Sequence, residues 1–145
     1  MSRLLIDTNV LVHLLFKTLD SYTEDLIRDY SNQVYVSSVS VKEIINLIQS
    51  GKVKSKNIQQ KSILEIIDEL YFEVLYVNKY HLQEMEKLPS VPNHNDPNDR
   101  LIISQALSNR LELVSTDLQF VNYRKYGLEF IKAKHTAKKK EKMKR

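Results

Sequence analysis

The order of apolar and polar residues along the chain predicts short strands that alternate with helices. Five stretches have the length and the composition of buried strands, at Arg3–Ile6, Val34–Ser37, Phe72–Val77, Leu111–Ser115 and around Leu128–Ile131. Helical spacing and helix-start residues predict helices at Val10–Phe16, Thr23–Tyr30, Ser38 or Ser40 to about Gln49, Lys56–Leu70, Tyr80–Leu88 and Asn98–Asn109. Such alternation is typical of a parallel sheet covered on both faces. We therefore expect an α/β fold, a three-layer α/β/α sandwich with a central, mainly parallel sheet of four to five strands.

Composition favours one folded domain that is rich in helices. The chain has 145 residues, of which 42% are apolar and 28% are charged, and only two glycines and three prolines. The absence of cysteine excludes disulfides and thiolate metal sites and agrees with a reducing compartment. The apolar N-terminal stretch is interrupted by Asp7 and Asn9 and is too short to span a bilayer. We expect a cytoplasmic protein with no membrane attachment.

The net charge of +4 is distributed unevenly along the chain. Lys132–Arg145 holds eight basic residues and one acid, whereas the preceding 131 residues hold 14 basic and 17 acidic residues. We therefore divide the chain into a domain at 1–131 and a lysine-rich, flexible tail at 132–145. A solvated terminus is the usual explanation of such a run, and electrostatic binding of nucleic acid is the alternative. The run lacks the aromatic residues that stack on bases.

Two aspartates follow predicted strands directly. Asp7 comes after Arg3–Ile6, and Asp117 comes shortly after Leu111–Ser115. Each could simply cap the next helix, because aspartate is common there. In parallel sheets, however, ligands bind beyond the carboxyl ends of the strands. Two acids on separate parallel strands are therefore expected to face the same crevice.

The stretch HNDPNDR contains two further aspartates, at the start of a predicted helix. Asp96 before Pro97 is typical of a helix start, and Asp99 is placed to complete a capping box. Asp99 also shares a helix face with Ile102 and Ile103, so it is predicted to point inward. Three inward acids would form an oxygen-rich site that suits Mg²⁺ or Mn²⁺.

The helical spacing of residues does not identify Glu43 as a candidate functional acid. In SVSVKEIINLI the apolar face is formed by Val41, Ile44 and Ile48, and Glu43 lies nearly opposite that face. From its position alone it is predicted to be an exposed glutamate.

Four segments together resemble the PIN domain family, in particular the VapC-type toxins of bacterial toxin–antitoxin pairs. They are LLIDTNVLV, SSVSVKEI, HNDPNDRLIISQAL and LVSTD, in the order and spacing of that family, within Leu4 to Tyr126. The resemblance implies an endoribonuclease that depends on Mg²⁺ or Mn²⁺, folded as a small α/β/α sandwich. It implies attack by water, which leaves 5′-phosphate and 3′-hydroxyl ends.

The resemblance also implies functional residues and partners. The family's acidic quartet corresponds to Asp7, Glu43, Asp99 and Asp117, and Glu43 enters on this ground alone. Asp7, Asp99 and Asp117 are the expected metal ligands. The expected supporting residues are Thr8, Asn9, Asp96, Arg100 and Thr116. Thr116 resembles the family's hydroxyl residue, which would support a metal-bound water or a phosphate, and Thr8 and Asn9 could also cap a helix. RNA would be the substrate, an antitoxin would be the protein partner, and homodimers are common in the family.

Two positions depart from the family pattern and two others have open roles. Asn98 replaces the usual phenylalanine of the signature, and Gln119 stands where many members have a further acid. For His94 we favour a structural hydrogen bond over metal ligation. For Arg100 we favour pairing with a carboxylate over contact with a phosphate.

Two other functions compete with the nuclease hypothesis. One is a non-catalytic PIN domain that binds nucleic acid through its basic tail, although degenerate members usually lose one of the acids. The other is a phosphoryl-transfer receiver or phosphatase, which also gathers acids at strand ends. Asp7-Thr8-Asn9 lacks the second acid of the D-x-D motif of that class, so we rank it last.

Overall fold

A five-stranded parallel sheet forms the centre of the protein in the computed structural model, which describes residues 1–54 and 60–136. The order of the strands is β3-β2-β1-β4-β5, and every pairing is parallel. The strands span Arg3–Ile6 (β1), Gln33–Ser37 (β2), Glu73–Leu75 (β3), Glu112–Ser115 (β4) and Glu129–Lys132 (β5). The predicted α/β fold with a parallel sheet is confirmed.

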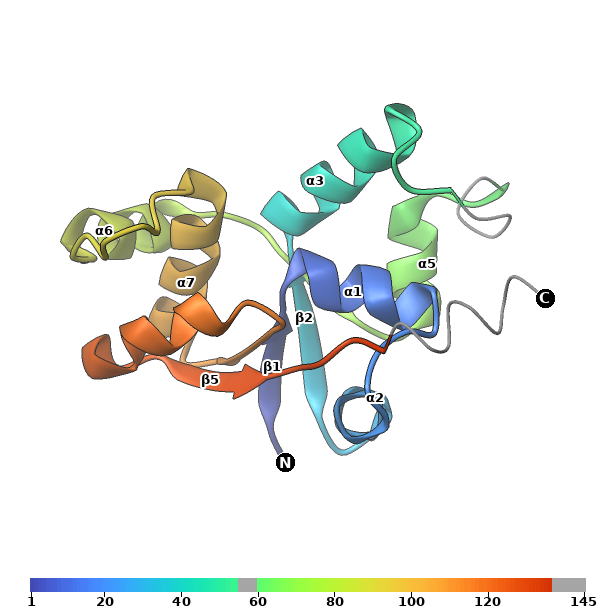
Figure 1. Ribbon diagram of the computed structural model, residues 1–145, viewed down its shortest axis with the longest axis horizontal. Helices are drawn as coiled ribbons and strands as arrows, with labels where there is room; N and C mark the ends of the chain where they lie inside the picture. Colours follow the sequence, from blue (N-terminus) through green and yellow to red (C-terminus); the bar gives the residue numbers. More distant parts are fainter. Residues whose placement is uncertain (55–59, 137–145) are drawn as a thin grey trace.

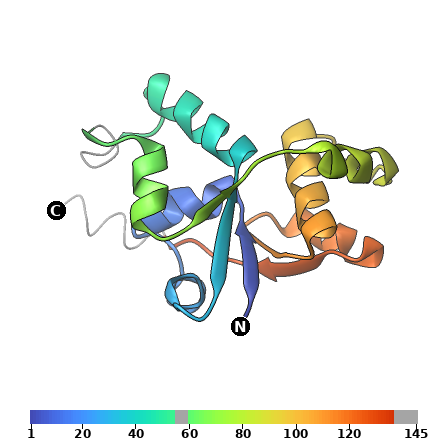
Figure 2. The same ribbon diagram turned by 180° about the vertical axis from the view of Figure 1, so that it is seen from behind.

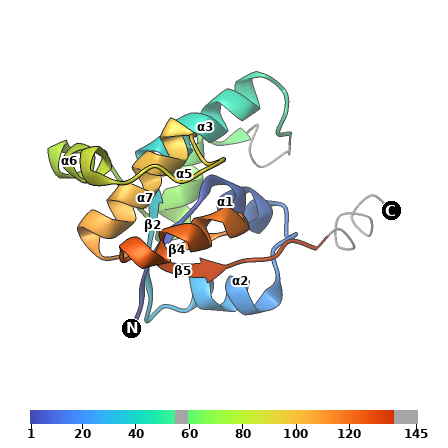
Figure 3. The same ribbon diagram turned by 60° about the vertical axis from the view of Figure 1, so that its left-hand side comes forward.

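Helices connect the strands and cover both faces of the sheet. They span Thr8–Leu15 (α1), Ser21–Arg28 (α2), Ser38–Gln49 (α3), Ile63–Glu69 (α5), Lys79–Lys87 (α6), Pro97–Asn109 (α7) and the 3₁₀ segment Leu118–Tyr126 (η1). Figure 1 shows α1, α2 and α5 on one side of the strands and α6 and α7 on the other. The opposite view in Figure 2 shows the same separation. Figure 3 labels β4 and β5. Strand β5 is the edge strand opposite β3, and β4 lies between β5 and β1.

Each face of the sheet has its own hydrophobic core, because successive side chains of a strand point to opposite faces. In β1, Leu4 and Ile6 pack with residues of α1, α2, α3 and α5, whereas Leu5 packs with residues of α7 and η1. Leu4, Leu5 and Ile6 are all completely buried. A central parallel strand buried on both faces explains the uninterrupted apolar sequence of β1.

Several element boundaries differ from the prediction. Helix α1 begins at Thr8 rather than Val10, because Asp7 caps it, and Ser37 rather than Ser38 or Ser40 caps α3. Strand β3 is limited to Glu73–Leu75, which pair with Tyr35–Ser37 of β2. The helix predicted at Lys56–Leu70 is described only as Ile63–Glu69, since residues 55–59 lie outside the described part of the chain. No prediction covered η1, whose start is capped by Asp117.

The described chain stays packed against the domain beyond residue 131, where the sequence places the start of the tail. Ala133 is completely buried, and its amide donates to the Ser115 carbonyl (2.8 Å). Farther along, the amide of Lys134 donates to Asp20 and that of Thr136 donates to the Thr18 carbonyl. Figure 1 shows this segment passing between α1 and α2. Residues 137–145 of the predicted tail lie outside the described residues.

The described helices are all too short or too polar to cross a lipid bilayer.

Candidate active site

The candidate site lies at the carboxyl edge of the sheet. Strands β1 and β4 are adjacent and parallel, so the residues that follow them leave the sheet at the same edge. Helix α3 follows β2 directly at this edge and packs against both α1 and α7. Figure 1 shows the first turns of α1 and α3 at this end of the strands. This arrangement places acids from four separate segments close together.

Asp7 is the most deeply buried of the four predicted acids, with a relative exposure of 5%. Its Oδ1 accepts a hydrogen bond from the Thr8 amide (2.8 Å), and its Oδ2 accepts one from the Ser115 hydroxyl (2.8 Å). Burial raises the pKa of Asp7 to about 6, against the opposing effect of these two hydrogen bonds. The negative charges of Glu43 and Asp117 raise it further.

Glu43 is only half-buried rather than fully exposed, and its side chain reaches the site. Its Oε1 accepts a hydrogen bond from the Thr8 hydroxyl (2.8 Å), which also lies 2.8 Å from the Ser40 hydroxyl. The prediction from spacing, an exposed glutamate, is wrong. Helix α3 packs against α1, so Glu43 in its second turn lies within reach of Thr8 at the start of α1, although other polar residues of α3 are exposed.

Asp99 lies in the first turn of α7 and points inward as predicted, with a side-chain exposure of 25%. Its Oδ2 lies 3.3 Å from Nε2 of His94. Burial raises the pKa of Asp99 to about 7, and the charges of Asp7, Asp96, Glu43 and Asp117 add to this effect. Among the described residues, its carboxylate makes no capping-box hydrogen bond to the Asp96 amide, so only the Asp96 half of the predicted box is formed.

Asp117 is more accessible than Asp7 and Asp99, with a side-chain exposure of 37%. It caps η1 by accepting a hydrogen bond from the Gln119 amide (2.9 Å), and its own amide donates to the Ser115 hydroxyl (3.0 Å). Its Oδ2 lies 4.0 Å from Nε2 of His94. Ligand atoms of His94, Asp99 and Asp117 all lie within 4.8 Å of one another, a spacing that a single metal ion can bridge.

The predicted supporting residues differ in what they contact. Thr8 joins Glu43 to Ser40, and Asp96 caps α7 by accepting hydrogen bonds from the amides of residues 98 and 99. Asn9 is exposed and Thr116 is half-buried. Within the described part of the chain, neither side chain makes a hydrogen bond.

Arg100 does not pair with a carboxylate in the described structure, and that prediction is wrong. Its guanidinium donates to the main-chain carbonyls of Pro89 (3.1 Å) and Leu88 (2.8 Å), so it ties the start of α7 to the end of α6. The preceding loop presents these carbonyls after Pro89 has interrupted the helical pattern. His94 forms a structural hydrogen bond of the kind that we favoured, between Nδ1 and the Tyr123 hydroxyl (2.8 Å).

Sequence reasoning missed three residues that contact the acids or their neighbours. Ser115 and Ser40 are completely buried and supply hydroxyls to Asp7 and Thr8 respectively. Tyr123 is also completely buried and holds His94. For Ser115 a signal existed, since a polar residue at the end of an apolar strand lies beside the strand-end acids. For Tyr123 there was none, because η1 itself was not predicted.

The donor set fits a hard divalent cation. Carboxylate oxygens predominate, and they are close enough to raise the pKa of Asp7 and Asp99 by mutual repulsion as well as by burial. A cation bound among them would relieve both effects, because it compensates the buried negative charge. The buried Nε2 of His94, which has no hydrogen-bond partner, faces the same group.

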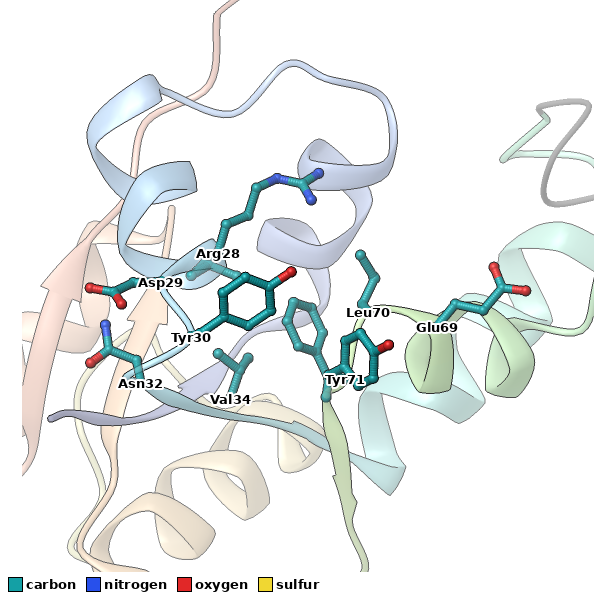
Figure 4. A pocket seen from close by; sticks show the side chains of 10 residues that line it. Arg28, Asp29, Tyr30, Asn32, Val34, Glu69, Leu70 and Tyr71 are labelled. Atoms are coloured by element: carbon teal, nitrogen blue, oxygen red, sulfur yellow. The ribbon is translucent and has the colours of Figure 1, made fainter.

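A pocket of about 430 Å³ lies at the opposite, amino edge of the sheet and contains none of the candidate residues. It is lined by residues that precede or begin β2 and β3, among them Arg28, Tyr30, Val34 and Tyr71. Figure 4 shows the two tyrosine rings reaching it from different connections, Tyr30 from α2–β2 and Tyr71 from α5–β3. The acidic cluster is therefore separate from this pocket.

Several solved structures with a similar fold are VapBC structures. VapBC2 from Rickettsia felis, bound to a DNA fragment from the promoter, matches with a TM-score of 0.66 and 21% identity over 91% of this chain and 99% of that chain. VapBC-1 from nontypeable Haemophilus influenzae matches with a TM-score of 0.64 and 17% identity, covering 90% and 97%. FitAcB from Neisseria gonorrhoeae matches with a TM-score of 0.65 and 17% identity, covering 88% and 96%.

The sequence comparisons place the chain in a family. The curated proteins contain no significant match. Residues 4–126, which include all four acids, match the PIN domain family. The chain therefore belongs to the PIN domain family, whose members are generally nucleases.

Proposed function

We propose that this protein is an endoribonuclease that depends on Mg²⁺ or Mn²⁺, with Asp7, Glu43, Asp99 and Asp117 as its catalytic acids. The observation that carries the proposal is the convergence of acids from β1, α3, α7 and the end of β4 at one edge of the sheet, where the pKa of Asp7 and of Asp99 is raised. Maintaining so much negative charge in a partly buried site is costly unless a cation compensates it.

Asp7, Asp99 and Asp117 would hold the metal, with Glu43 beside them. When bound, such a cation activates water and neutralises charge that develops on a phosphodiester. The protein's own groups keep these acids in place. The Ser115 hydroxyl and the Thr8 amide orient the two oxygens of Asp7, and the Thr8 hydroxyl orients Glu43. Asp99 sits in the first turn of α7, where the helix dipole favours a negative charge.

The biological setting that we propose is that of the toxin in a toxin–antitoxin pair. The fold likeness to VapBC structures supports a protein antitoxin as the partner, and the resemblance of the four sequence segments to VapC-type toxins implies RNA as the substrate. The likeness extends over almost the whole of those chains, so it is not limited to a part of their fold.

The direct test replaces Asp7 or Asp99 by Asn and measures cleavage of RNA with Mg²⁺, with Mn²⁺ and with EDTA. We expect each variant to lose about a thousandfold or more in rate, because loss of several kcal/mol of charge stabilisation has that effect. EDTA should abolish wild-type cleavage. Mn²⁺ binding, measured by calorimetry, should weaken in both variants.

The matched control is Asp25→Asn, which removes an exposed aspartate of α2 and should leave both measurements unchanged. Undiminished cleavage by Asp7→Asn or Asp99→Asn, or undiminished cleavage in EDTA, contradicts the proposed site. Wild-type protein that binds RNA and cleaves none in either metal supports the non-catalytic alternative instead.

A further inference from the structure

His94 has one side-chain nitrogen without a hydrogen-bond partner in a buried position. The residue is only 5% exposed, and Nε2 makes no hydrogen bond of acceptable geometry. The atom faces two acids, at 3.3 Å from Oδ2 of Asp99 and 4.0 Å from Oδ2 of Asp117. A buried nitrogen without a partner is unfavourable and needs a physical explanation. Either Nε2 presents a lone pair to a metal ion, or it presents a proton to a carboxylate.

The other side of the ring is held firmly. Nδ1 of His94 lies 2.8 Å from the hydroxyl oxygen of Tyr123, a side chain that is completely buried. The edge of Phe120 packs against the imidazole, with ring centroids 5.2 Å apart and planes at 84°. The orientation of the ring is therefore set by η1, which carries both aromatic residues.

The neighbours of Nε2 indicate which way the hydrogen bond between Tyr123 and His94 runs. Burial raises the pKa of Tyr123, and hydrogen bonding and charge from the Arg100 guanidinium oppose that rise. The carboxylates of Asp99 and Asp117, which face Nε2, only accept hydrogen bonds, so a neutral His94 carries its proton on Nε2 and the Tyr123 hydroxyl donates to Nδ1. Arg100 is itself anchored by the carbonyls of Leu88 and Pro89.

An Nδ1 that accepts leaves the proton of a neutral imidazole on Nε2. We propose that Tyr123 and His94 form a relay of hydrogen-bond donors that directs the Nε2 proton of His94 toward the Asp99 carboxylate. His94 is then a positioning residue, because a protonated Nε2 has no lone pair for a metal. The proposal deepens the proposed function, since it rests on Asp99 being a metal ligand, but the tautomer itself does not depend on catalysis.

The decisive measurement is the tautomer of His94 in the whole, ¹⁵N-labelled protein. Long-range ¹H–¹⁵N correlation spectra at pH 8, without metal and then with Mg²⁺, distinguish a protonated Nε2 from an unprotonated one. The signals of His94 are identified among those of four histidines by their loss in His94→Gln. We expect Nε2 to carry the proton in both spectra. A proton on Nδ1, or its loss from Nε2 when Mg²⁺ is added, overturns the proposal in favour of metal ligation.

Substitutions test the relay at its centre. Tyr123→Phe keeps the ring but removes the hydroxyl, so we expect His94 to lose its fixed tautomer and Mn²⁺ affinity to fall about 10- to 100-fold, as for other outer partners of metal ligands. His94→Gln should retain more affinity than His94→Ala, because its amide also presents an N–H to Asp99. The control is Tyr30→Phe, at a tyrosine that is 93% exposed, which should change neither measurement.

An unaltered tautomer and affinity in Tyr123→Phe contradicts the relay. If that variant does not fold, the wild-type spectra still decide the question, because they need no substitution in the relay. A protein that shows the Nε2 proton but cleaves no RNA keeps the relay and refutes the proposed function. The two failures are thus distinguishable.

Discussion

A single buried hydroxyl, that of Thr8, joins two of the elements that build the site. Thr8 begins α1, whereas Ser40 and Glu43 belong to α3, and its Oγ1 lies 2.8 Å from a side-chain oxygen of each. Because a carboxylate only accepts, the proton of Thr8 is directed to Glu43. The resemblance to the family suggested Thr8 as a supporting residue but implied no particular contact for it. A helix cap was the alternative role. In the structure the cap of α1 is Asp7, and the hydroxyl of Thr8 instead contacts α3.

Replacing Thr8 by Val tests this contact without changing the shape of the side chain. We expect the free energy of unfolding to fall by about 1–3 kcal/mol, because Ser40 and Glu43 both lose a buried partner. Thr8→Ser, which keeps the hydroxyl, should lower the free energy of unfolding clearly less than Thr8→Val. Chemical denaturation measures both variants, and equal losses in the two would show that packing rather than the hydroxyl is responsible.

Helix α7 carries Asp99 into the site, and its first residue is set by its cap. Asp96 accepts hydrogen bonds from the amides of Asn98 (2.8 Å) and Asp99 (3.4 Å), and Pro97 occupies the first helical position. The same carboxylate raises the pKa of Asp99 through its charge. The cap therefore stabilises the helix and at the same time makes the neighbouring acid easier to protonate.

Two substitutions separate these effects of Asp96. Asp96→Ala should lower the free energy of unfolding by about 1 kcal/mol. Asp96→Ser should lower the free energy of unfolding much less, because serine is also a good cap. Both should lower the pKa of Asp99, since both remove the charge. Denaturant unfolding gives the first quantity and ¹³C-detected titration of the Asp99 carboxyl gives the second. If the pKa of Asp99 is unchanged in both variants, the result contradicts the effect of the Asp96 charge on Asp99.

Across the whole molecule, the folding of four segments onto one edge of the sheet concentrates negative charge that the unfolded chain separates. The pKa of Asp7 is about 6 and that of Asp99 about 7 in the folded protein, both raised from the ordinary aspartate value of 3.8. At pH values between about 4 and about 7, these two acids therefore hold more protons in the folded state than in the unfolded state. The contribution of these two acids to the free energy of unfolding therefore falls as pH rises from about 4 to about 7.

This linkage predicts how Mg²⁺ and pH act together. In metal-free protein, the melting temperature of the wild type relative to that of Asp99→Asn should fall as pH rises from 5 to 8. Mg²⁺ binds the deprotonated acids, so it should raise the wild-type melting temperature more at pH 8 than at pH 5. Thermal denaturation at several pH values checks both statements. A larger effect of Mg²⁺ at pH 5 would have the wrong sign for this cluster.

Local sequence determined much of this protein. The apolar strands, the inward face of α7 and the caps at Asp7, Asp96 and Asp117 depend on interactions within a few residues, which the order of side chains specifies. Parallel strands also predict that Asp7 and Asp117 meet at one edge, because topology alone puts their strand ends there.

Only the tertiary structure decided the rest, because those contacts join segments far apart in the chain. Glu43 lies on the polar side of α3, and reaches the site because α3 packs against both α1 and α7. Ser115 orients Asp7 across 108 positions of sequence. Arg100 binds carbonyls rather than an acid, since the end of α6 lies beside it. The periodicity of a helix shows which residues share a face, but the elements that pack around it decide whether that face is exposed.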